Sequence, residues 1–252
     1  MIETTIIEKE KVKMKSPILV EGLPGIGLVG KIAADHLRAE LKAELVAELY
    51  SPHFPHQVIM QKNGVMRMIK NRLYLVRGKK NDLLILVGDV QAITSEAQYE
   101  ITGRMLDYFQ KKGVTLMVTL GGYGTGKVHD KPRVFGIVSN KPMIGDYKKL
   151  GVIFGECRGS IIGAAGLLLG LGKLRKMPGV CLMGETHGGF VDPKGAQAVL
   201  EVLCKALEVK IDLKKLQARA KESEKFAKKM EAEALAAKGV GAPGKHDLSY
   251  IR

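Results

Sequence analysis

Apolar and polar positions are arranged in blocks along the first 210 residues of the chain. Short apolar runs, of the length of strands buried on both faces, recur between longer stretches with a helical period. The strand-like runs are residues 17–20, 83–88, 114–120 and 180–183, and the helical stretches are residues 28–41, 95–112, 160–173 and 193–209. Alternation on this scale predicts an α/β fold with a mostly parallel central sheet and helices on both faces.

Further segments carry a weaker strand pattern. Residues 44–50, 57–61 and 72–76 mix polar with apolar side chains, and residues 133–138 are strand-like. The pair Asn63-Gly64 follows the second of these segments. Because this pair favours the backbone of a tight turn, we expect a hairpin there.

Two predicted helices begin with capping residues. Thr94 or Ser95 can cap the helix at residues 95–112, and Gln98 lies three positions beyond Ser95. Asp192 precedes Pro193, which places a capping residue directly before a proline at the first helical position.

The pattern changes after Val209. Asp212 can cap a long helix that ends near Ala237, before Gly239. Small and apolar residues recur along it with the three-four spacing of a heptad seam, and the opposite face is Lys and Glu. This stripe could pack on the protein's own core or pair with another copy. The predicted division is a core domain at residues 1–210, a helical extension at residues 211–238 and a flexible tail at residues 239–252.

The end of the tail is unusual in composition. A glycine-rich linker at residues 239–244 precedes a terminal cluster that contains Leu248, Tyr250, Ile251 and Arg252. Frayed chain ends are normally small and polar. The cluster is therefore a candidate docking segment for another protein, and an inert tail is the alternative.

Composition and charge narrow the class of protein. The 252 residues are 46% hydrophobic and 26% charged, which is typical of a globular protein. The net charge of +14 comes mostly from Lys interleaved with Glu, as on the solvated surface of a heat-tolerant protein. Such a surface could also attract nucleic acid, an anionic membrane or an acidic protein. With aromatics at only 5%, we favour an acidic protein over nucleic acid.

The cysteines and the apolar runs indicate in which cellular compartment the protein is expected. Cys157, Cys181 and Cys204 are far apart and in apolar settings, so we expect small core residues in a reducing compartment. The first 15 residues alternate charged and apolar side chains, unlike a signal peptide. The longest apolar stretch, residues 161–171, is shorter than the roughly 20 residues that span a bilayer. A cytoplasmic protein with no membrane partner is expected.

A first glycine motif has the form of a dinucleotide fingerprint. Gly25, Gly27 and Gly30 give G-x-G-x-x-G between a predicted strand and helix, with Glu44 or Glu48 near the expected acidic position. Pro24 stiffens the turn, and no second nucleotide-binding half follows. We interpret the motif as a tight strand-to-helix turn with close packing.

A second glycine motif resembles a phosphate-binding loop. Gly121 to Lys127 matches G-x-x-x-x-G-K, but Val128 stands where a Ser or Thr is needed to hold magnesium. A strand-like segment follows in place of a helix. We interpret residues 121–126 as a glycine-rich loop at the end of a strand.

A third segment carries acid–base candidates. Glu185 and His187 follow the strand at residues 180–183, where open parallel sheets bind ligands. Neither Thr186 nor Cys181 stands in a nucleophile motif, so a loop hydrogen-bonded by Glu185 is the favoured interpretation. The other histidines show no metal-ligand spacing beyond the isolated pair at residues 53 and 56. No catalytic, cofactor-binding or metal-binding residue is therefore assigned.

Taken together, the motifs resemble the proteasome assembly chaperone 2 family, in particular its archaeal PbaA/PbaB-like members. The resemblance rests on the order and spacing of four segments and covers roughly residues 10–215. The segments are Gly22-Leu-Pro-Gly-Ile-Gly-Leu-Val-Gly30, Gly88-Asp89, Leu120-Gly-Gly122 and Met183-Gly-Glu185-Thr186.

The resemblance implies a phosphorylase-like α/β core, no cofactor, and a homo-oligomer, for which we expect a tetramer or pentamer. It also implies ATP-independent help in assembling the proteasome core particle. Members of this kind can insert a C-terminal hydrophobic-Tyr-X motif between proteasome α subunits. Here Tyr250 is third from the end and Ser249 stands at the hydrophobic position, so the motif is shifted, with Leu248, Tyr250 and Ile251 as apolar anchors beside Arg252.

The leading prediction is thus a non-enzymatic, proteasome assembly chaperone-like protein that binds core-particle α subunits through its tail. One alternative is an enzyme of ligase or phosphorylase-like type that uses the glycine-rich loops and Glu185. A second is a basic nucleic-acid-binding protein, for which binding with a steep salt dependence would be diagnostic.

Overall fold

The computed structural model describes residues 3–9, 11–157, 159–218 and 220–222. Its strands are β1 (Thr5–Glu8), β2 (Ile18–Gly22), β3 (Glu44–Tyr50), β4 (Val58–Met60), β5 (Met66–Met68), β6 (Asn71–Val76), β7 (Leu83–Gly88), β8 (Leu116–Gly124), β9 (Val134–Val138) and β10 (Gly179–Thr186). Its α-helices are α1 (Val29–Glu40), α2 (Ser95–Lys111), α3 (Ile144–Lys149), α4 (Ala164–Leu174) and α5 (Pro193–Ala206), with short 3-10 turns η1 (Ile26–Leu28) and η2 (Lys141–Met143).

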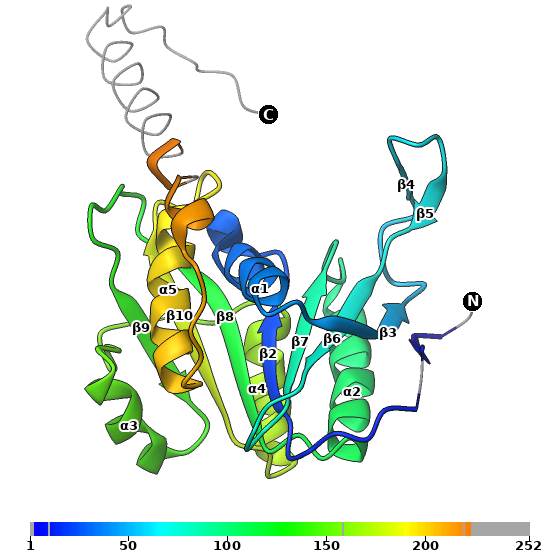
Figure 1. The fold of residues 1–252 in the computed structure, drawn as a ribbon, viewed down its shortest axis with the longest axis horizontal. Helices are drawn as coiled ribbons and strands as arrows, with labels where there is room; N and C mark the ends of the chain where they lie inside the picture. Colours follow the sequence, from blue (N-terminus) through cyan, green and yellow to red (C-terminus); the bar gives the residue numbers. More distant parts are fainter. Residues whose placement is uncertain (1–2, 10, 158, 219, 223–252) are drawn as a thin grey trace, which may run out of the picture.

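The main sheet has eight strands in the order β1-β3-β6-β7-β2-β8-β10-β9 (Figure 1). The four central strands β7, β2, β8 and β10 are parallel. The strands on either side pair antiparallel, with β1, β3 and β6 beyond β7 and with β9 beyond β10. The sheet is thus mixed, and the prediction of a mostly parallel sheet holds only for its centre.

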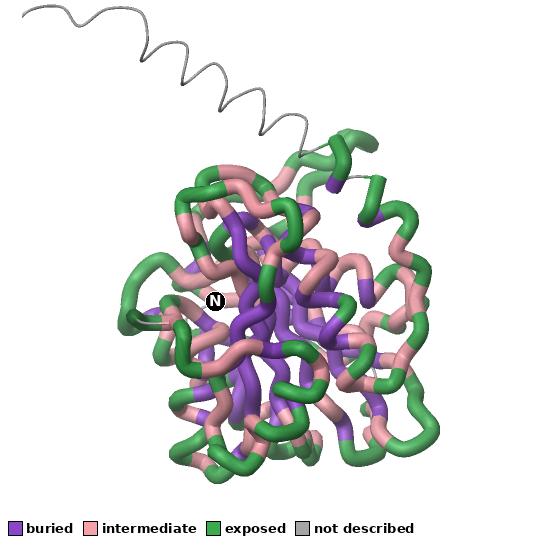
Figure 2. The backbone as a smooth tube through the Cα atoms, turned by 90° about the vertical axis from the view of Figure 1, so that its left-hand side faces the viewer, coloured by how far each residue is buried: buried purple, intermediate pink, exposed green. Residues whose placement is uncertain are grey.

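Helices cover both faces of this sheet, as predicted. In Figure 1, α1 and α5 lie in front of the sheet, and α2 and α4 lie behind it. Side chains alternate along each strand, so Val20 joins the core cluster under α1 and α5 while Leu19 joins the cluster under α2 and α4. Figure 2 shows the buried residues concentrated along the sheet. The core therefore consists of two apolar layers, one on each face.

Both predicted helix caps are confirmed. The Thr94 side chain accepts a hydrogen bond from the Ala97 N–H at 3.3 Å and starts α2. The Asp192 carboxylate accepts bonds from the Lys194 and Gly195 N–H groups, and Pro193 is the first residue of α5.

Other sequence predictions need correction. β8 continues to Gly124, so residues 121–124 belong to the strand and not to a loop, because β10 pairs with β8 as far as Thr186 opposite Gly124. The short elements β1 and α3 carried too weak a pattern to be predicted, and β1 is held mainly by pairing with β3.

The predicted extension at residues 211–238 and the tail at residues 239–252 lie outside the described residues, except for 211–218 and 220–222. Within that part, Asp212 accepts a hydrogen bond from the Lys214 N–H at 2.8 Å, as a cap would. Leu213 and Leu216 of the predicted seam pack against the α1–α5 core cluster, and Ala220 is buried. The start of the seam therefore contacts the protein's own body.

Candidate partner-binding surface

The β4–β5 hairpin projects from the body beside β3 and β6 (Figure 1). Its strands pair Val58 with Met68 and Met60 with Met66, and the turn at Gly64 has a positive φ of 79°. The hairpin expected at the Asn63-Gly64 pair is thus confirmed.

One face of the hairpin is apolar and uncovered by the described part of the chain. Because side chains alternate along a strand, Val58, Met60, Met66 and Met68 share this face. Met60 is 89% exposed and Met66 is 68% exposed. Methionine is flexible and polarizable, which suits an adaptable interface. An exposed apolar face of this kind is a candidate interaction surface for another protein.

The opposite face fixes the hairpin to the body. Ile59 packs against the α2–α4 core cluster, and Phe54 and Ile69, which flank the hairpin in sequence, are buried in that cluster. A two-stranded hairpin alone is marginally stable in water. These contacts at its base are therefore needed to hold the exposed face in place.

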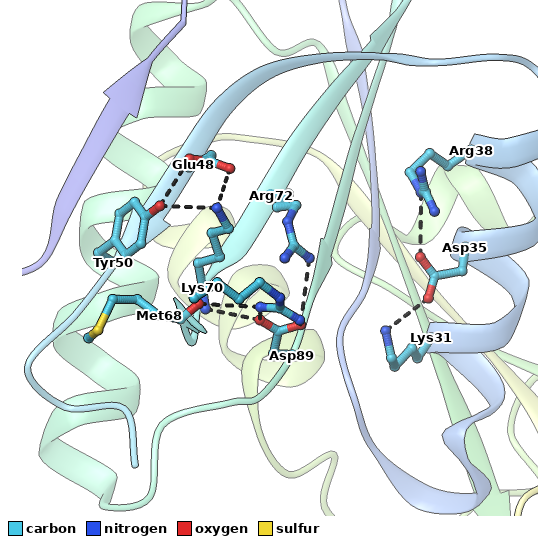
Figure 3. Close-up of polar contacts among 10 residues, drawn as sticks. Lys31, Asp35, Arg38, Glu48, Tyr50, Met68, Lys70, Arg72 and Asp89 are labelled. Atoms are coloured by element: carbon cyan, nitrogen blue, oxygen red, sulfur yellow. Dashed lines mark hydrogen bonds and ion pairs between the residues drawn. The ribbon is translucent and has the colours of Figure 1, made fainter. Parts of the chain in front are cut away.

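Asp89, directly after β7, forms ion pairs with arginines at the base of the hairpin (Figure 3). Arg67 of β5 contacts both Asp89 oxygens, at 2.5 and 3.1 Å, and Arg72 of β6 lies 3.5 Å away. The Lys70 N–H donates to the same carboxylate at 3.1 Å. Burial alone would raise the pKa of Asp89, but these partners hold it below its ordinary value.

A second ion pair lies beside the first (Figure 3). The Lys70 ammonium is 2.6 Å from Glu48 of β3, and the Tyr50 hydroxyl donates to Glu48 at 3.0 Å. Burial opposes ionisation of both groups, yet their pairing lowers the pKa of Glu48 and raises the pKa of Lys70. Ion pairs and hydrogen bonds thus connect residues 67–72 to β3 and to the end of β7.

The first glycine motif is explained by packing. Gly27 has a φ of +60°, and a Cβ there would lie 2.8 Å from Thr186 Oγ1. A Cβ on Gly30 would lie 2.2 Å from the carbonyl oxygen of Leu120. The glycines let the start of α1 approach β8 and β10 closely, which supports the interpretation as a tight strand-to-helix turn.

Glu185 is a buried structural carboxylate near the end of β10. It receives the Arg133 guanidinium at 2.8 Å and the Arg133 N–H at 3.1 Å, and His129 Nδ1 lies 3.6 Å away. The Arg133 guanidinium holds the pKa of Glu185 below its ordinary value, although burial opposes it. An ionised carboxylate saturated by arginine is a poor general acid. The structure places Glu185 in the strand and not in a loop, and His187 stacks on Phe190 at 4.7 Å.

The cysteines are free thiols. Burial raises the pKa of Cys181 to about 12 and that of Cys204 to about 11, so both are neutral and weakly nucleophilic. Cys181 is a core residue as predicted, whereas Cys157 and Cys204 are half-buried. Within the described ranges, no group of His, Cys, Asp and Glu could hold a metal ion. No helix in that part of the chain is long and apolar enough to cross a bilayer.

The predicted docking residues Leu248, Tyr250, Ile251 and Arg252 lie outside the described residues. Sequence reasoning did not single out the apolar face of the hairpin. The available signal was the alternation of Val58, Met60, Met66 and Met68 about the predicted turn.

Comparison with known proteins identifies a matching family and similar proteins. The model of the PAC2 family matches residues 19–231. Uncharacterized protein MJ1210 from Methanocaldococcus jannaschii is 37% identical over 94% of this chain and 93% of its own length.

Two solved structures from Pyrococcus furiosus are similar along most of the chain. PbaB, described as an archaeal proteasome activator, is 44% identical with a TM-score of 0.86, over 92% of this chain and 100% of that one. PbaA, described as an archaeal homolog of proteasome-assembly chaperone, is 28% identical with a TM-score of 0.76, over 94% of each chain.

Proposed function

Because this chain belongs to the PAC2 family, we propose that it is a proteasome assembly chaperone-like or activator-like factor of the cytoplasm. It binds the core particle and does so without ATP. The observation that carries this proposal is the similarity to PbaB, at 44% identity over essentially its whole length. The family is of the chaperone and assembly-factor type, which supports a role in binding and not in catalysis.

The docking element of the proposal is the C-terminal tail. Tyr250, Ile251 and Arg252, with Leu248 in support, enter pockets between proteasome α subunits. Aromatic and arginine side chains are frequent interface anchors. The net charge of +14 would steer the body towards an acidic ring surface.

The apolar face of the β4–β5 hairpin has a different role in this proposal, the contact between copies of this chain. A permanent contact between identical subunits is typically apolar. The four side chains that share this face, Val58, Met60, Met66 and Met68, are all apolar. A tetramer or pentamer would present several tails to one α ring, which increases the overall affinity through effective concentration.

The test of tail docking compares three forms of the protein on immobilised α rings from the same organism. They are the full chain, a chain that ends at Gly244, and a full chain with Tyr250→Ala. We expect the truncation to abolish binding and Tyr250→Ala to weaken it at least tenfold, because the anchors are removed. Ser249→Ala is the matched control within the tail and should bind normally.

Light scattering on each form checks that the oligomer is intact. Undiminished binding by the chain that ends at Gly244 would contradict tail docking. It would leave the family assignment standing and would direct attention to the body as the contact surface.

A further inference from the structure

A cavity of about 540 Å³ lies at the carboxyl ends of β2, β8 and β10. After β2 the chain forms β3, β6 and β7 on one side of β2, with β7 directly beside it, and then crosses to β8 and β10 on the other side. Such a reversal of strand order is where open α/β sheets bind ligands. The volume is in the range of small-molecule pockets.

The floor of the cavity is one face of the sheet. Glu21 of β2 and Cys181 of β10 occupy the same row across the strands, on either side of Thr119 of β8. Gly121 lies two residues further along β8, and a Cβ there would meet only Met183 Cγ, at 3.8 Å. The missing side chain of Gly121 therefore leaves open space above the sheet.

The walls of the cavity are fixed by Gln91, which follows β7. Its Oε1 accepts the Ala164 N–H at 2.8 Å, and its Nε2 donates to the Pro24 carbonyl at 2.6 Å. Gly163 has a φ of +90°, and a Cβ there would lie 2.5 Å from Gln91 Oε1. One side chain thus joins the turn before α1 to the start of α4, so the cavity is formed before any ligand enters.

Glu21 is the exceptional residue of this cavity. It lines the cavity and is only 1% exposed. Its Oε1 accepts the Leu23 N–H at 2.8 Å, but its Oε2 has no hydrogen-bond partner within the described part of the chain. A buried polar atom without a partner is destabilising, so native proteins keep few of them.

Burial raises the pKa of Glu21 to about 8, although the Leu23 N–H opposes the shift. The carboxyl group is therefore mostly protonated at neutral pH, and its Oε2 can donate one hydrogen bond. Cys181 and Tyr123 are the other titratable residues that line the cavity, and no described lining residue is Lys, Arg or His.

We propose that this cavity binds a small, mostly apolar and uncharged organic molecule whose hydrogen-bond acceptor, a carbonyl or an aromatic nitrogen, is bound by Glu21. The apolar lining contributes most of the affinity, and the donor of Glu21 orients the ligand. An anionic ligand such as a phosphate would be buried beside a carboxyl group without a cation among the described lining residues, which is costly. The inference is independent of the proteasome role.

Four aromatic probes of similar size test the proposal on the full-length protein. Acetophenone and benzamide are neutral and carry a carbonyl acceptor, benzylamine is a cation, and benzoate is an anion. Binding is followed by the methyl NMR signals of ¹³C-labelled methionines, among which Met183 lines the cavity. We expect the two neutral probes to shift the Met183 signal and benzoate not to bind.

Variants locate the binding. Gly121→Leu fills the space above β8 and should abolish binding, whereas Gly145→Ala, at a glycine of α3 with open space around it, should leave binding unchanged. Glu21→Leu removes the donor and should weaken binding at least tenfold. Glu21→Gln keeps a donor and should still bind.

The pH profile distinguishes a donor from a mere apolar contact. Binding to the wild type should fall as the pH rises through about 8, because Glu21 loses its proton, and binding to Glu21→Gln should not. A thermal melt of each variant confirms folding. The proposal is overturned if no neutral probe binds at millimolar concentration, if benzoate or benzylamine binds more tightly, or if Gly121→Leu binds as the wild type does.

Discussion

At the scale of single residues, Glu21 links burial to the pH dependence of folding. The unfolded chain ionises this carboxyl at its ordinary pKa of 4.5, whereas the folded protein holds the proton until about pH 8. Between these values the unfolded state releases a proton that the native state retains. The contribution of Glu21 to stability is therefore lost as the pH rises from about 4.5 to about 8.

Glu21→Gln should remove this dependence. We expect the variant to exceed the wild type in unfolding free energy by about 4 kcal/mol at pH 8, and to match it closely at pH 4.5, since a neutral amide has no proton to lose. Urea unfolding at the two pH values measures the difference. The same pH dependence in variant and wild type would show that Glu21 ionises normally in the folded protein.

The sequence alone identified some of these residues and not others. Glu185 stood out because it lies in a glycine-rich segment directly after a predicted strand. Its pairing with Arg133 could not be predicted, because it depends on β9 lying beside β10, which no local pattern specifies. Glu21 was not singled out, because the predicted strand ended at Val20. Its signal was a lone carboxylate between the apolar run and Gly22.

At the scale of elements, the β4–β5 hairpin depends on the charges at its base. Asp89 receives Arg67, Arg72 and the Lys70 N–H, and its side chain is only 14% exposed. Charge-assisted bonds of this kind, partly shielded from water, contribute more than surface ion pairs. The position of the apolar face is thus coupled to one carboxylate.

Asp89→Asn should loosen the hairpin. We expect the unfolding free energy to fall by about 1–2 kcal/mol, and the amides of residues 58–68 to exchange faster with deuterium, because Arg67 and Arg72 lose their anion. Hydrogen exchange followed by mass spectrometry measures the second effect.

Asp35→Asn is the matched control for this variant (Figure 3). It removes partly exposed pairs with Lys31 and Arg38 on α1, so the cost should stay within about 0.5 kcal/mol and the hairpin should be unaffected. An unchanged exchange rate in Asp89→Asn would mean that the apolar contacts at the base suffice to hold the hairpin.

Periodicity predicted the regular elements well and the sheet edges poorly. The strands at residues 44–50 and 83–88 were located with their observed bounds, although only residues 83–88 carry the strong signal of an apolar run. The parallel centre follows from strand–helix alternation. The antiparallel edges could not be predicted, since they depend on which strand the chain returns beside.

At the scale of the whole molecule, we propose that the folded body of this PAC2 family member assembles into an oligomer. The apolar hairpin face is exposed among the residues that the structure describes, and the start of the predicted seam packs on the protein's own core through Leu213 and Leu216. The hairpin is thus a better candidate than this part of the seam for contact between copies.

A double variant, Met60→Ser with Met66→Ser, should shift the oligomer towards monomers. The unfolding free energy should change by less than about 0.5 kcal/mol, because both side chains are already exposed in the single chain. Light scattering over a range of concentrations measures the mass. Lys62→Ser, in the turn of the same hairpin, is the control and should leave the mass unchanged. An unaltered mass in the double variant would exclude this face as the subunit contact.

We propose above that this protein binds the proteasome core particle as a chaperone-like or activator-like factor. Native mass spectrometry of the full-length protein mixed with recombinant α subunits of the same organism, without nucleotide, tests it most directly. We expect a defined complex of an α ring with an oligomer of this chain, unchanged when ATP is added. The absence of a complex at low salt, or a complex that forms only with ATP, would contradict it.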